Sequence, residues 1–246
     1  MCLVHVCSCA PIPGTRLIDV FMLYLIPTPI GNLGDITLRA LETLKSVDVI
    51  AAEDTRETGK LLKHFGIGKP LFSFHEHSAD TKRRDLLARL EQGETVALVS
   101  EAGTPLVSDP GYKLVREALR RGVRVEALPG AAAFVTALVA SGAPPDRFAF
   151  FGFLPPKTGA RQRRLAELAA YPETLIFYES PHRLLKMLAD VRAVLGERSV
   201  AVARELTKKF EEIKRGKVSE VMDAFGRSGV RGEIVVIVWG KDKEEA

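Results

Sequence analysis

The chain has 246 residues, of which 46% are hydrophobic and 27% charged, and it carries a formal net charge of +4. This balance excludes a disordered or fibrous protein. No apolar run reaches the roughly eighteen residues that a membrane-spanning helix needs. The length suits one large domain or two ordinary ones, and we expect two. The modest positive charge suits an anionic partner without establishing one.

The N-terminal segment 1–21 differs from the rest of the chain. It contains all three cysteines within its first nine residues, so no disulfide can staple the body of the protein, and we expect a reducing, cytoplasmic location. It lacks helix or strand periodicity and the basic start of a signal peptide. We interpret it as an extension outside the fold, with Met22 as the natural start. Its cysteines and His5 lack paired Cys-x-x-Cys spacing, so no metal site is predicted.

From Leu23 onward, short apolar runs alternate with amphipathic stretches, which predicts an α/β fold. Asp35 is the expected N-cap of the first helix. Expected strands cover residues 23–29, 47–55, 69–77, 95–103 and 123–130, and expected helices cover 35–46, 57–66, 81–93, 111–122 and 131–142.

A turn-rich joint at residues 143–146 indicates a domain boundary. We therefore predict two α/β domains, over residues 22–143 and 144–241, followed by a charged tail over 242–246. In the second domain, expected strands cover 146–156, 173–180, 199–207 and 232–240, with helices over 181–196 and 218–226. The stretch 156–171 is basic and then amphipathic, and 210–216 is a short piece of unassigned type.

The first segment that suggests chemistry is PTPIGNLGD, from Pro27 to Asp35, between a strand and a helix. Such turns place backbone amides at the carboxyl end of a sheet, where α/β proteins bind ligands. The segment has neither a Walker lysine nor the G-x-G-x-x-G of dinucleotide folds. An ordinary βα turn is an equal alternative.

The second segment is SEAGTPLVSDPG, from Ser100 to Gly111, again directly after a strand. It is long for a structural connection, and long loops in compact domains tend to be functional. Its glycines allow close approach of backbone to a ligand, and Glu101 and Asp109 offer carboxylates. The alternative is a surface Ω-loop.

The third segment is LPGAAA, from Leu128 to Ala133, where a strand ends and a helix of small side chains begins. Small residues at that point leave room for a flat group such as adenine. Tight packing of the helix explains the same residues.

Together the three segments resemble the tetrapyrrole methylase superfamily. More narrowly, PTPIGNLGDIT, AAEDTR, FHEH, SEAGTPLVSDPG, LPG, FYESPHR and ARELTK, in this order and spacing, resemble the ribosomal RNA small subunit methyltransferase I family over about residues 22–240. In the wider superfamily the second loop usually reads Gly-Asp-Pro. Here the run from Glu101 to Pro105 replaces it, as in the ribosomal RNA branch.

The resemblance implies S-adenosylmethionine as cofactor, the 2′-oxygen of a cytidine in small-subunit ribosomal RNA as acceptor, and a homodimer. The cofactor is expected in a cleft between the domains. The residues implied in its binding are Thr28, Pro29, Ile30, Gly31, Ser100, Glu101, Ala102, Gly103, Thr104, Asp109, Pro129, Gly130, Ala131, Ala132, Tyr178 and Glu179.

Methyl transfer to a hydroxyl requires alignment of the reacting atoms and help with loss of the proton. We rank Glu101 and Asp54 first as proton acceptors, and His75 next because imidazole titrates near neutrality. Salt bridging, as between Asp54 and Arg56, is the alternative role, and alignment without a dedicated base remains open. Further candidates are Glu53, Glu76, His77, Glu179 and Lys208.

RNA binding requires cations that meet phosphates. The densest basic group follows Pro155 and Pro156, and two others lie at residues 82–84 and 208–217; each is on its own most often a solvated surface. The residues predicted to bind the ribosomal RNA or the assembled small subunit are Lys157, Arg161, Arg163, Arg164 and Lys208. A porphyrin-type small-molecule methyltransferase and a non-catalytic RNA-binding module are the competing hypotheses.

Overall fold

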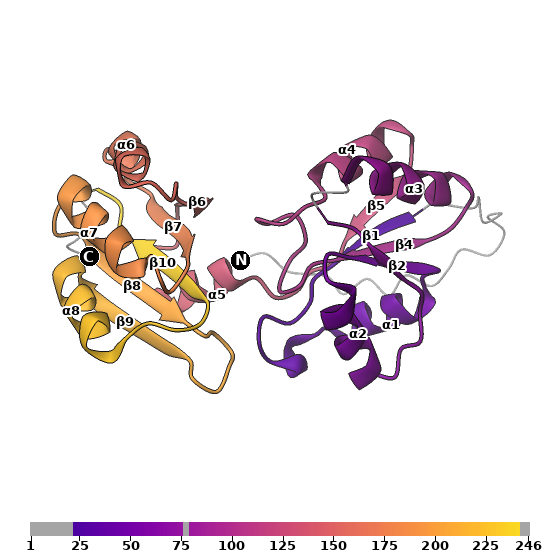
Figure 1. Cartoon of the computed structure of the whole chain (residues 1–246), viewed down its shortest axis with the longest axis horizontal. Helices are drawn as coiled ribbons and strands as arrows, with labels where there is room; N and C mark the ends of the chain where they lie inside the picture. The colour runs from indigo at the N-terminus through magenta and orange to yellow at the C-terminus, as the bar shows by residue number, and fades with distance from the viewer. Residues whose placement is uncertain (1–21, 76–78, 242–246) are drawn as a thin grey trace, which may run out of the picture.

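The computed structural model describes residues 22–75 and 79–241, which form two five-stranded sheets (Figure 1). The segment 1–21, the tail 242–246 and residues 76–78, which include Glu76 and His77, lie outside the described residues. Among the described helices, none combines the length and apolar character that crossing a bilayer requires.

The first sheet is parallel throughout, with strand order β3-β2-β4-β1-β5. Its central strands are apolar runs because helices cover both faces, as in other parallel sheets. The strands are β1 (Met22–Ile26), β2 (Val49–Ala52), β3 (Leu71–Ser73), β4 (Val96–Val99) and β5 (Arg124–Ala127).

Two helices cover each face of this sheet (Figure 1). Helices α1 (Leu38–Ser46) and α2 (Thr55–His64) bury Leu44 and Leu62 against one face. Helices α3 (Ala79–Glu91) and α4 (Tyr112–Arg120) bury Leu87 and Leu114 against the other. Every β-to-α loop therefore leaves the same edge of the sheet, where the carboxyl ends of the strands meet.

The start of α1 differs from the prediction. Asp35 lies in a short 3-10 turn (Leu33–Asp35), and α1 begins at Leu38. Thr37 is its N-cap, because the Thr37 hydroxyl accepts a hydrogen bond from the N–H of Ala40 at 3.0 Å. Threonine and aspartate both cap helices, and residue type alone did not decide between them.

The second sheet is mixed, with strand order β6-β7-β10-β8-β9. Strands β6 and β7 are parallel, and the other neighbours are antiparallel. Its members are β6 (Phe148–Phe153), β7 (Thr174–Glu179), β8 (Ser199–Arg204), β9 (Glu212–Lys217) and β10 (Ile234–Val238). The short piece of unassigned type is thus the edge strand β9.

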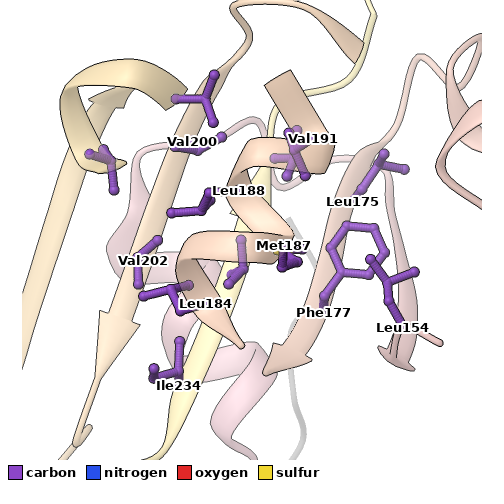
Figure 2. Packing of buried hydrophobic residues seen from close by; sticks show 14 of the residues in the cluster. Leu154, Leu175, Phe177, Leu184, Met187, Leu188, Val191, Val200, Val202 and Ile234 are labelled. Carbon is purple, nitrogen blue, oxygen red and sulfur yellow. The ribbon is translucent and has the colours of Figure 1, made fainter. Parts of the chain in front are cut away.

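One face of the second sheet carries α6 (Thr158–Leu168), α7 (Leu184–Leu195) and α8 (Val218–Ser228). Figure 2 shows Leu184, Leu188 and Val191 of α7 packed among side chains of the strands, including Phe177 and Val202. These residues are fully buried, so α7 anchors this half of the molecule.

Helix α5 (Ala133–Ser141) covers the opposite face of the second sheet. Its Ala137 and Leu138 are buried with Ile176, Ala201 and Val235. The sequence places this helix in the first domain, before the joint at 143–146, whereas its packing joins it to the second. The chain passes from one half to the other over residues 128–132, ahead of α5.

Candidate active site

Hydrogen bonds tie the three sequence segments to one another at the edge of the first sheet. Thr28 and Gly103 form a two-way backbone bridge, with N–H to O distances of 2.9 and 3.0 Å. The Thr28 hydroxyl donates to the Ser100 carbonyl at 3.1 Å, and the Ser100 hydroxyl donates to the Gly103 carbonyl at 2.7 Å. The Thr104 hydroxyl donates to the Ala131 carbonyl at 2.9 Å. Loops that are far apart in the sequence thus form one wall.

Two glycines allow this close approach. Gly103 has φ +87°, and a Cβ there would lie 3.2 Å from the Ile30 side chain. A Cβ on Gly130 would lie 2.5 Å from Cβ of Pro27, closer than carbon atoms pack. A larger residue at either position would push the loops apart.

In front of this wall lies a cleft of about 430 Å³ between the two halves of the molecule. That volume falls within the roughly 300–1,000 Å³ of small-molecule sites. Of the residues predicted from the sequence, those that line it are Ile30, Glu101, Ala102, Gly103, Thr104, Asp109, Ala132, Tyr178 and Glu179. The remainder, which form or flank the wall without lining the cleft, are Thr28, Pro29, Gly31, Ser100, Pro129, Gly130 and Ala131.

Part of the cleft lining comes from residues that were not predicted to bind the cofactor. Ser180, Pro181, Ala203 and Leu206 lie in the FYESPHR and ARELTK motifs, which could have indicated them. The turn and strand at 232–235 carry no chemical signal, and they reach the cleft because β10 lies between β7 and β8. Val107, Ser108 and Ala133 lie within the second and third segments singled out from the sequence, and Phe153 was not predicted.

Asp109 is the carboxyl group of the cleft whose ionisation is most altered. Burial raises its pKa to about 6, and the charges of Glu53 and Glu101 add to the effect. Glu53 and Glu101 follow the neighbouring strands β2 and β4, so the carboxyl ends of these strands bring the three acids together. Burial, opposed by a hydrogen bond with the backbone of Phe134, raises the pKa of Tyr178, and the nearby charge of Asp109 adds to it. Asp109 therefore changes protonation close to neutral pH.

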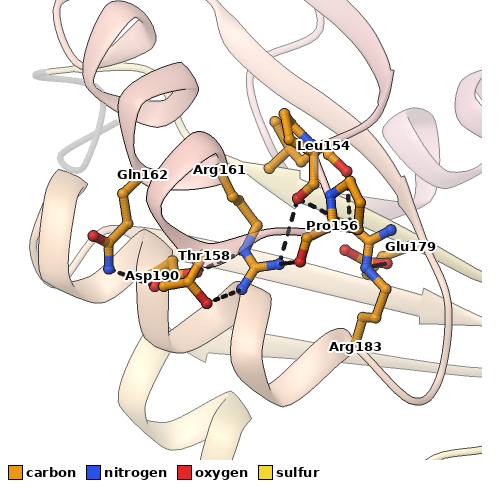
Figure 3. Close-up of polar contacts among 9 residues, drawn as sticks. Leu154, Pro156, Thr158, Arg161, Gln162, Glu179, Arg183 and Asp190 are labelled. Atoms are coloured by element: carbon orange, nitrogen blue, oxygen red, sulfur yellow. Dashed lines mark hydrogen bonds and ion pairs between the residues drawn. The ribbon is translucent and has the colours of Figure 1, made fainter.

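Glu179, at the end of β7, is a second unusual carboxylate of the cleft wall, and it is only 3% exposed. Its Oε1 accepts a hydrogen bond from the N–H of Ser180 at 2.7 Å and lies 3.2 Å from Nε of Arg183 (Figure 3). Its Oε2 is buried without a hydrogen-bond partner in the described structure. Burial raises the pKa of Glu179 despite the opposing contacts with Ser180 and Arg183. A buried acceptor without a donor costs free energy, which a ligand that supplies a donor would recover.

Strained backbone flanks the cleft on both sides. Leu106 and Ser108 have φ of 72° and 66°, and Glu205 and Thr207 have φ of 51° and 66°. Non-glycine residues in this region cost about 1–3 kcal/mol each, and they cluster at ligand sites. Ser108 lines the cleft itself. Leu206, which also lines the cleft, lies between the strained residues Glu205 and Thr207.

The three predicted proton acceptors have different surroundings. Glu101 lines the cleft. Asp54 is instead the N-cap of α2, where it accepts from the N–H of Arg56 at 2.7 Å, and this hydrogen bond lowers its pKa. Neither Asp54 nor His75, which follows β3, is among the residues that line the cleft. The structure thus corrects the role of Asp54, which stabilises a helix terminus.

The structure also corrects the predicted role of Arg161. This side chain is 1% exposed, and its Nε donates to Asp190 at 2.6 Å (Figure 3). Its Nη1 donates to the Pro156 carbonyl at 3.2 Å. A guanidinium held in this way fixes the start of α6 against α7 and does not face RNA.

The other predicted RNA-binding residues remain accessible to different degrees. Lys157, Arg163 and Arg164 are exposed on or beside α6, although Arg164 pairs with Glu167. Lys208 pairs with Glu205 at 3.0 Å and Glu233 at 3.2 Å, and its alkyl chain lies where a Cβ on Gly31 would be. These contacts neutralise Lys208 and hold it against the first half of the molecule. In residues 22–75 and 79–241, no cluster of His, Cys, Asp and Glu is suited to hold a metal ion.

Comparison with known proteins decides the family. The family model for Tetrapyrrole (Corrin/Porphyrin) Methylases matches residues 22–222. A protein named ribosomal RNA small subunit methyltransferase I from Escherichia coli O157:H7 is 54% identical over 226 residues, which cover 91% of this chain and 79% of that protein. The chain belongs to this family. A relative of the same name from Haemophilus influenzae is 51% identical over 91% of this chain and 80% of its own length.

Solved structures similar to this member of the methyltransferase I family share its fold. Cobalt precorrin-4 methyltransferase, a cobalamin biosynthetic enzyme, has a TM-score of 0.69 at 21% identity, covering 92% of this chain and 98% of that one. Uroporphyrin-III C-methyltransferase from Thermus thermophilus, complexed with S-adenosylhomocysteine, has a TM-score of 0.63 at 21% identity, covering 89% and 97%. Diphthine synthase has a TM-score of 0.67 at 14% identity, and the match covers 89% of this chain and 90% of that one. These likenesses confirm the predicted two-part α/β architecture.

Proposed function

We propose that this protein methylates the ribose 2′-hydroxyl of a cytidine in small-subunit ribosomal RNA, with S-adenosylmethionine as methyl donor. The observation that carries the proposal is the cleft, which combines loops from the first sheet with strand ends from the second. The chain that forms it is 54% identical to a protein named ribosomal RNA small subunit methyltransferase I. A cytoplasmic location and a homodimer remain predictions.

The cleft suits S-adenosylmethionine in shape and in polar groups. Gly103 has no side chain and Ala132 has only a methyl group, so a flat purine has room to lie against the backbone there. Helix α5 begins at Ala133 on the cleft wall, and no side chain caps its N-terminus, which is favourable for the carboxylate of the cofactor. The unpartnered Oε2 of Glu179 offers an acceptor for an ammonium or hydroxyl group. Thr104 and Tyr178 complete the group that we expect to hold the cofactor.

S-adenosylmethionine supplies an electrophilic methyl group on a sulfonium centre when it is bound. The protein itself must orient the ribose hydroxyl and accept its proton. Asp109 suits proton acceptance because a pKa of about 6 leaves its carboxylate ionised at neutral pH yet basic enough to take a proton. Glu101 lines the same part of the cleft and keeps Asp109 basic through its charge.

Transfer of radiolabel tests the function. The full chain is incubated with labelled S-adenosylmethionine and small subunits from a strain that lacks the corresponding gene. We expect label in the ribosomal RNA and, after nuclease digestion, in 2′-O-methylcytidine. Label in another nucleoside or in no RNA would refute the proposal.

The two competing functions give different results in related assays. A porphyrin-type methyltransferase would label a tetrapyrrole substrate and leave RNA unlabelled; the replacement of Gly-Asp-Pro by the run from Glu101 to Pro105 argues against it. A non-catalytic module would bind RNA but show no heat with S-adenosylmethionine in calorimetry.

A further inference from the structure

Helix α4 carries a row of cations on the outer face of the first domain. Lys113, Arg116 and Arg120 are spaced by three and four residues, so they follow one another along the same side of the helix. All three are exposed, and they border a groove of about 460 Å³ between α3 and α4. From Lys113 to Arg120 the row extends about 10 Å along the helix axis.

The carboxylate that borders this groove is already engaged by other cations. Glu117 accepts hydrogen bonds from Arg121 at 2.6 Å and from Arg83 at 3.0 Å. By contrast, no carboxylate of the described residues lies within ion-pair distance of Lys113, Arg116 or Arg120, although the charge of Lys113, after that of Arg83, helps to lower the pKa of Asp80. Like charges one helical turn apart repel each other, so an anion bound along the row would relieve the repulsion between Arg116 and its two neighbours, Lys113 and Arg120.

An exposed aromatic ring lies at the end of the row nearest the cleft. Tyr112 is the first residue of α4 and is 64% exposed. The guanidinium of Arg116 lies 5.6 Å from the centre of its ring. Asp109, which lines the cleft, precedes Tyr112 by only three residues. The surface made of Tyr112, Lys113, Arg116 and Arg120, here called the α4 face, therefore starts beside the catalytic cleft.

We propose that the α4 face binds a single-stranded segment of the ribosomal RNA next to the methylated nucleotide. The three cations contact successive phosphates, and the ring of Tyr112 stacks on a base. This inference rests on the proposed function and identifies the surface that docks its substrate. A single strand fits best, because a nucleotide must leave its helix to place the ribose in a cleft, and aromatic rings stack on unpaired bases.

The salt dependence of binding tests the three cations. The full-length variant Lys113→Gln/Arg116→Gln/Arg120→Gln is titrated with an unmodified small-subunit rRNA transcript, and in parallel with unmodified small subunits, over a series of salt concentrations. For single strands, each lost phosphate contact lowers the slope of log K against log salt by about 0.7. We expect the slope to fall by about 2 and the affinity for S-adenosylmethionine to stay unchanged.

A matched control removes the same charge from the opposite face of the same domain. Lys45, Lys60 and Lys63 are exposed on α1 and α2. The variant Lys45→Gln/Lys60→Gln/Lys63→Gln is expected to keep the wild-type slope, since general loss of positive charge would affect both variants alike.

Substitutions at Tyr112 test the stacking contact. Tyr112→Ala is expected to weaken RNA binding by roughly fivefold to 150-fold, the usual effect of removing one stacked ring. Tyr112→Phe keeps the ring and should bind as the wild type does. Weakening by Tyr112→Phe equal to that by Tyr112→Ala would overturn the stacking contact.

The outcomes separate this inference from the proposed function. If the triple α4 variant binds with wild-type affinity and slope while the wild type methylates the RNA, then the α4 face is a solvated helix surface and the proposed function stands. If the wild type neither binds nor methylates the RNA, then both proposals are overturned.

Discussion

Replacement of Asp109 by asparagine is the most direct test of the chemistry. In the folded protein, burial raises the pKa of this carboxyl from 3.8 to about 6, with Glu53 and Glu101 adding to the shift. About nine tenths of the group is then ionised at pH 7 and about one tenth at pH 5. If Asp109 accepts the proton, wild-type kcat/KM falls about tenfold per pH unit below pH 6. Asp109→Asn should lose about 10²–10⁴ in kcat, the usual contribution of a general base.

The assay is label transfer to unmodified small subunits between about pH 5 and 8, with the affinity for S-adenosylmethionine measured separately by calorimetry. Asp109→Asn should abolish the acidic limb of the profile, while cofactor affinity changes far less than the rate. Glu101→Gln removes one of the charges that raise the pKa of Asp109, so the limb should move to lower pH. A wild-type profile in Asp109→Asn would refute the reasoning.

The same variant also tests the sign of the shift through stability. Because the pKa of Asp109 is higher in the folded than in the unfolded state, the protonated form favours folding, and this contribution is lost as the pH rises through about 6. Asparagine stays neutral at every pH. Asp109→Asn should therefore raise the melting temperature near pH 7.5, with a gain that shrinks toward about pH 4. The exposed Asp146 provides a control, and a gain of equal size at both pH values would contradict the assignment.

Three further substitutions test the supporting structure. Asp190→Ala leaves the buried guanidinium of Arg161 without its carboxylate. The free energy of unfolding, measured by urea titration, should therefore fall by about 3–5 kcal/mol. A loss below about 1 kcal/mol would contradict the burial of the pair. Glu179→Gln removes a charged acceptor from the cleft wall. In calorimetry it should weaken S-adenosylmethionine binding by about tenfold to a hundredfold, with little change in melting temperature. Unchanged affinity would show that Glu179 does not bind the cofactor. Gly130→Val places a side chain against Pro27 and should cost about 1–3 kcal/mol of stability, whereas a wild-type melting curve would show that the two loops can separate freely.

The convergence of the three loops was predictable from the sequence, because each follows an apolar strand. In a parallel sheet the carboxyl ends of all strands meet at one edge, so Thr28, Gly103 and Ala131 had to lie close together once the fold class was known. The start of α1 was less predictable. Asp35 and Thr37 are both good N-caps, and only the path of the chain through the turn at 33–35 decided for Thr37.

The roles of individual charged side chains were decided by tertiary contacts. Arg161 and Arg163 stand two residues apart in one basic run, yet one is buried and the other exposed. The difference comes from Asp190, which is 29 residues away in the sequence and reaches Arg161 through the packing of α6 on α7. Asp54, ranked as a proton acceptor, proved to cap α2. Asp109 gained its raised pKa from burial and from two carboxylates that follow neighbouring strands.

The sequence by itself determined the alternation of strands and helices, the family and the loops that form the wall of the cleft, since all of these depend on local patterns and on the common edge of a parallel sheet. Tertiary structure alone decided that α5 packs on the second sheet, that residues 232–235 reach the cleft and that Asp109 titrates near pH 6. The physical reason is that burial and the charges around a group depend on which distant segments surround it, and no local pattern records those neighbours.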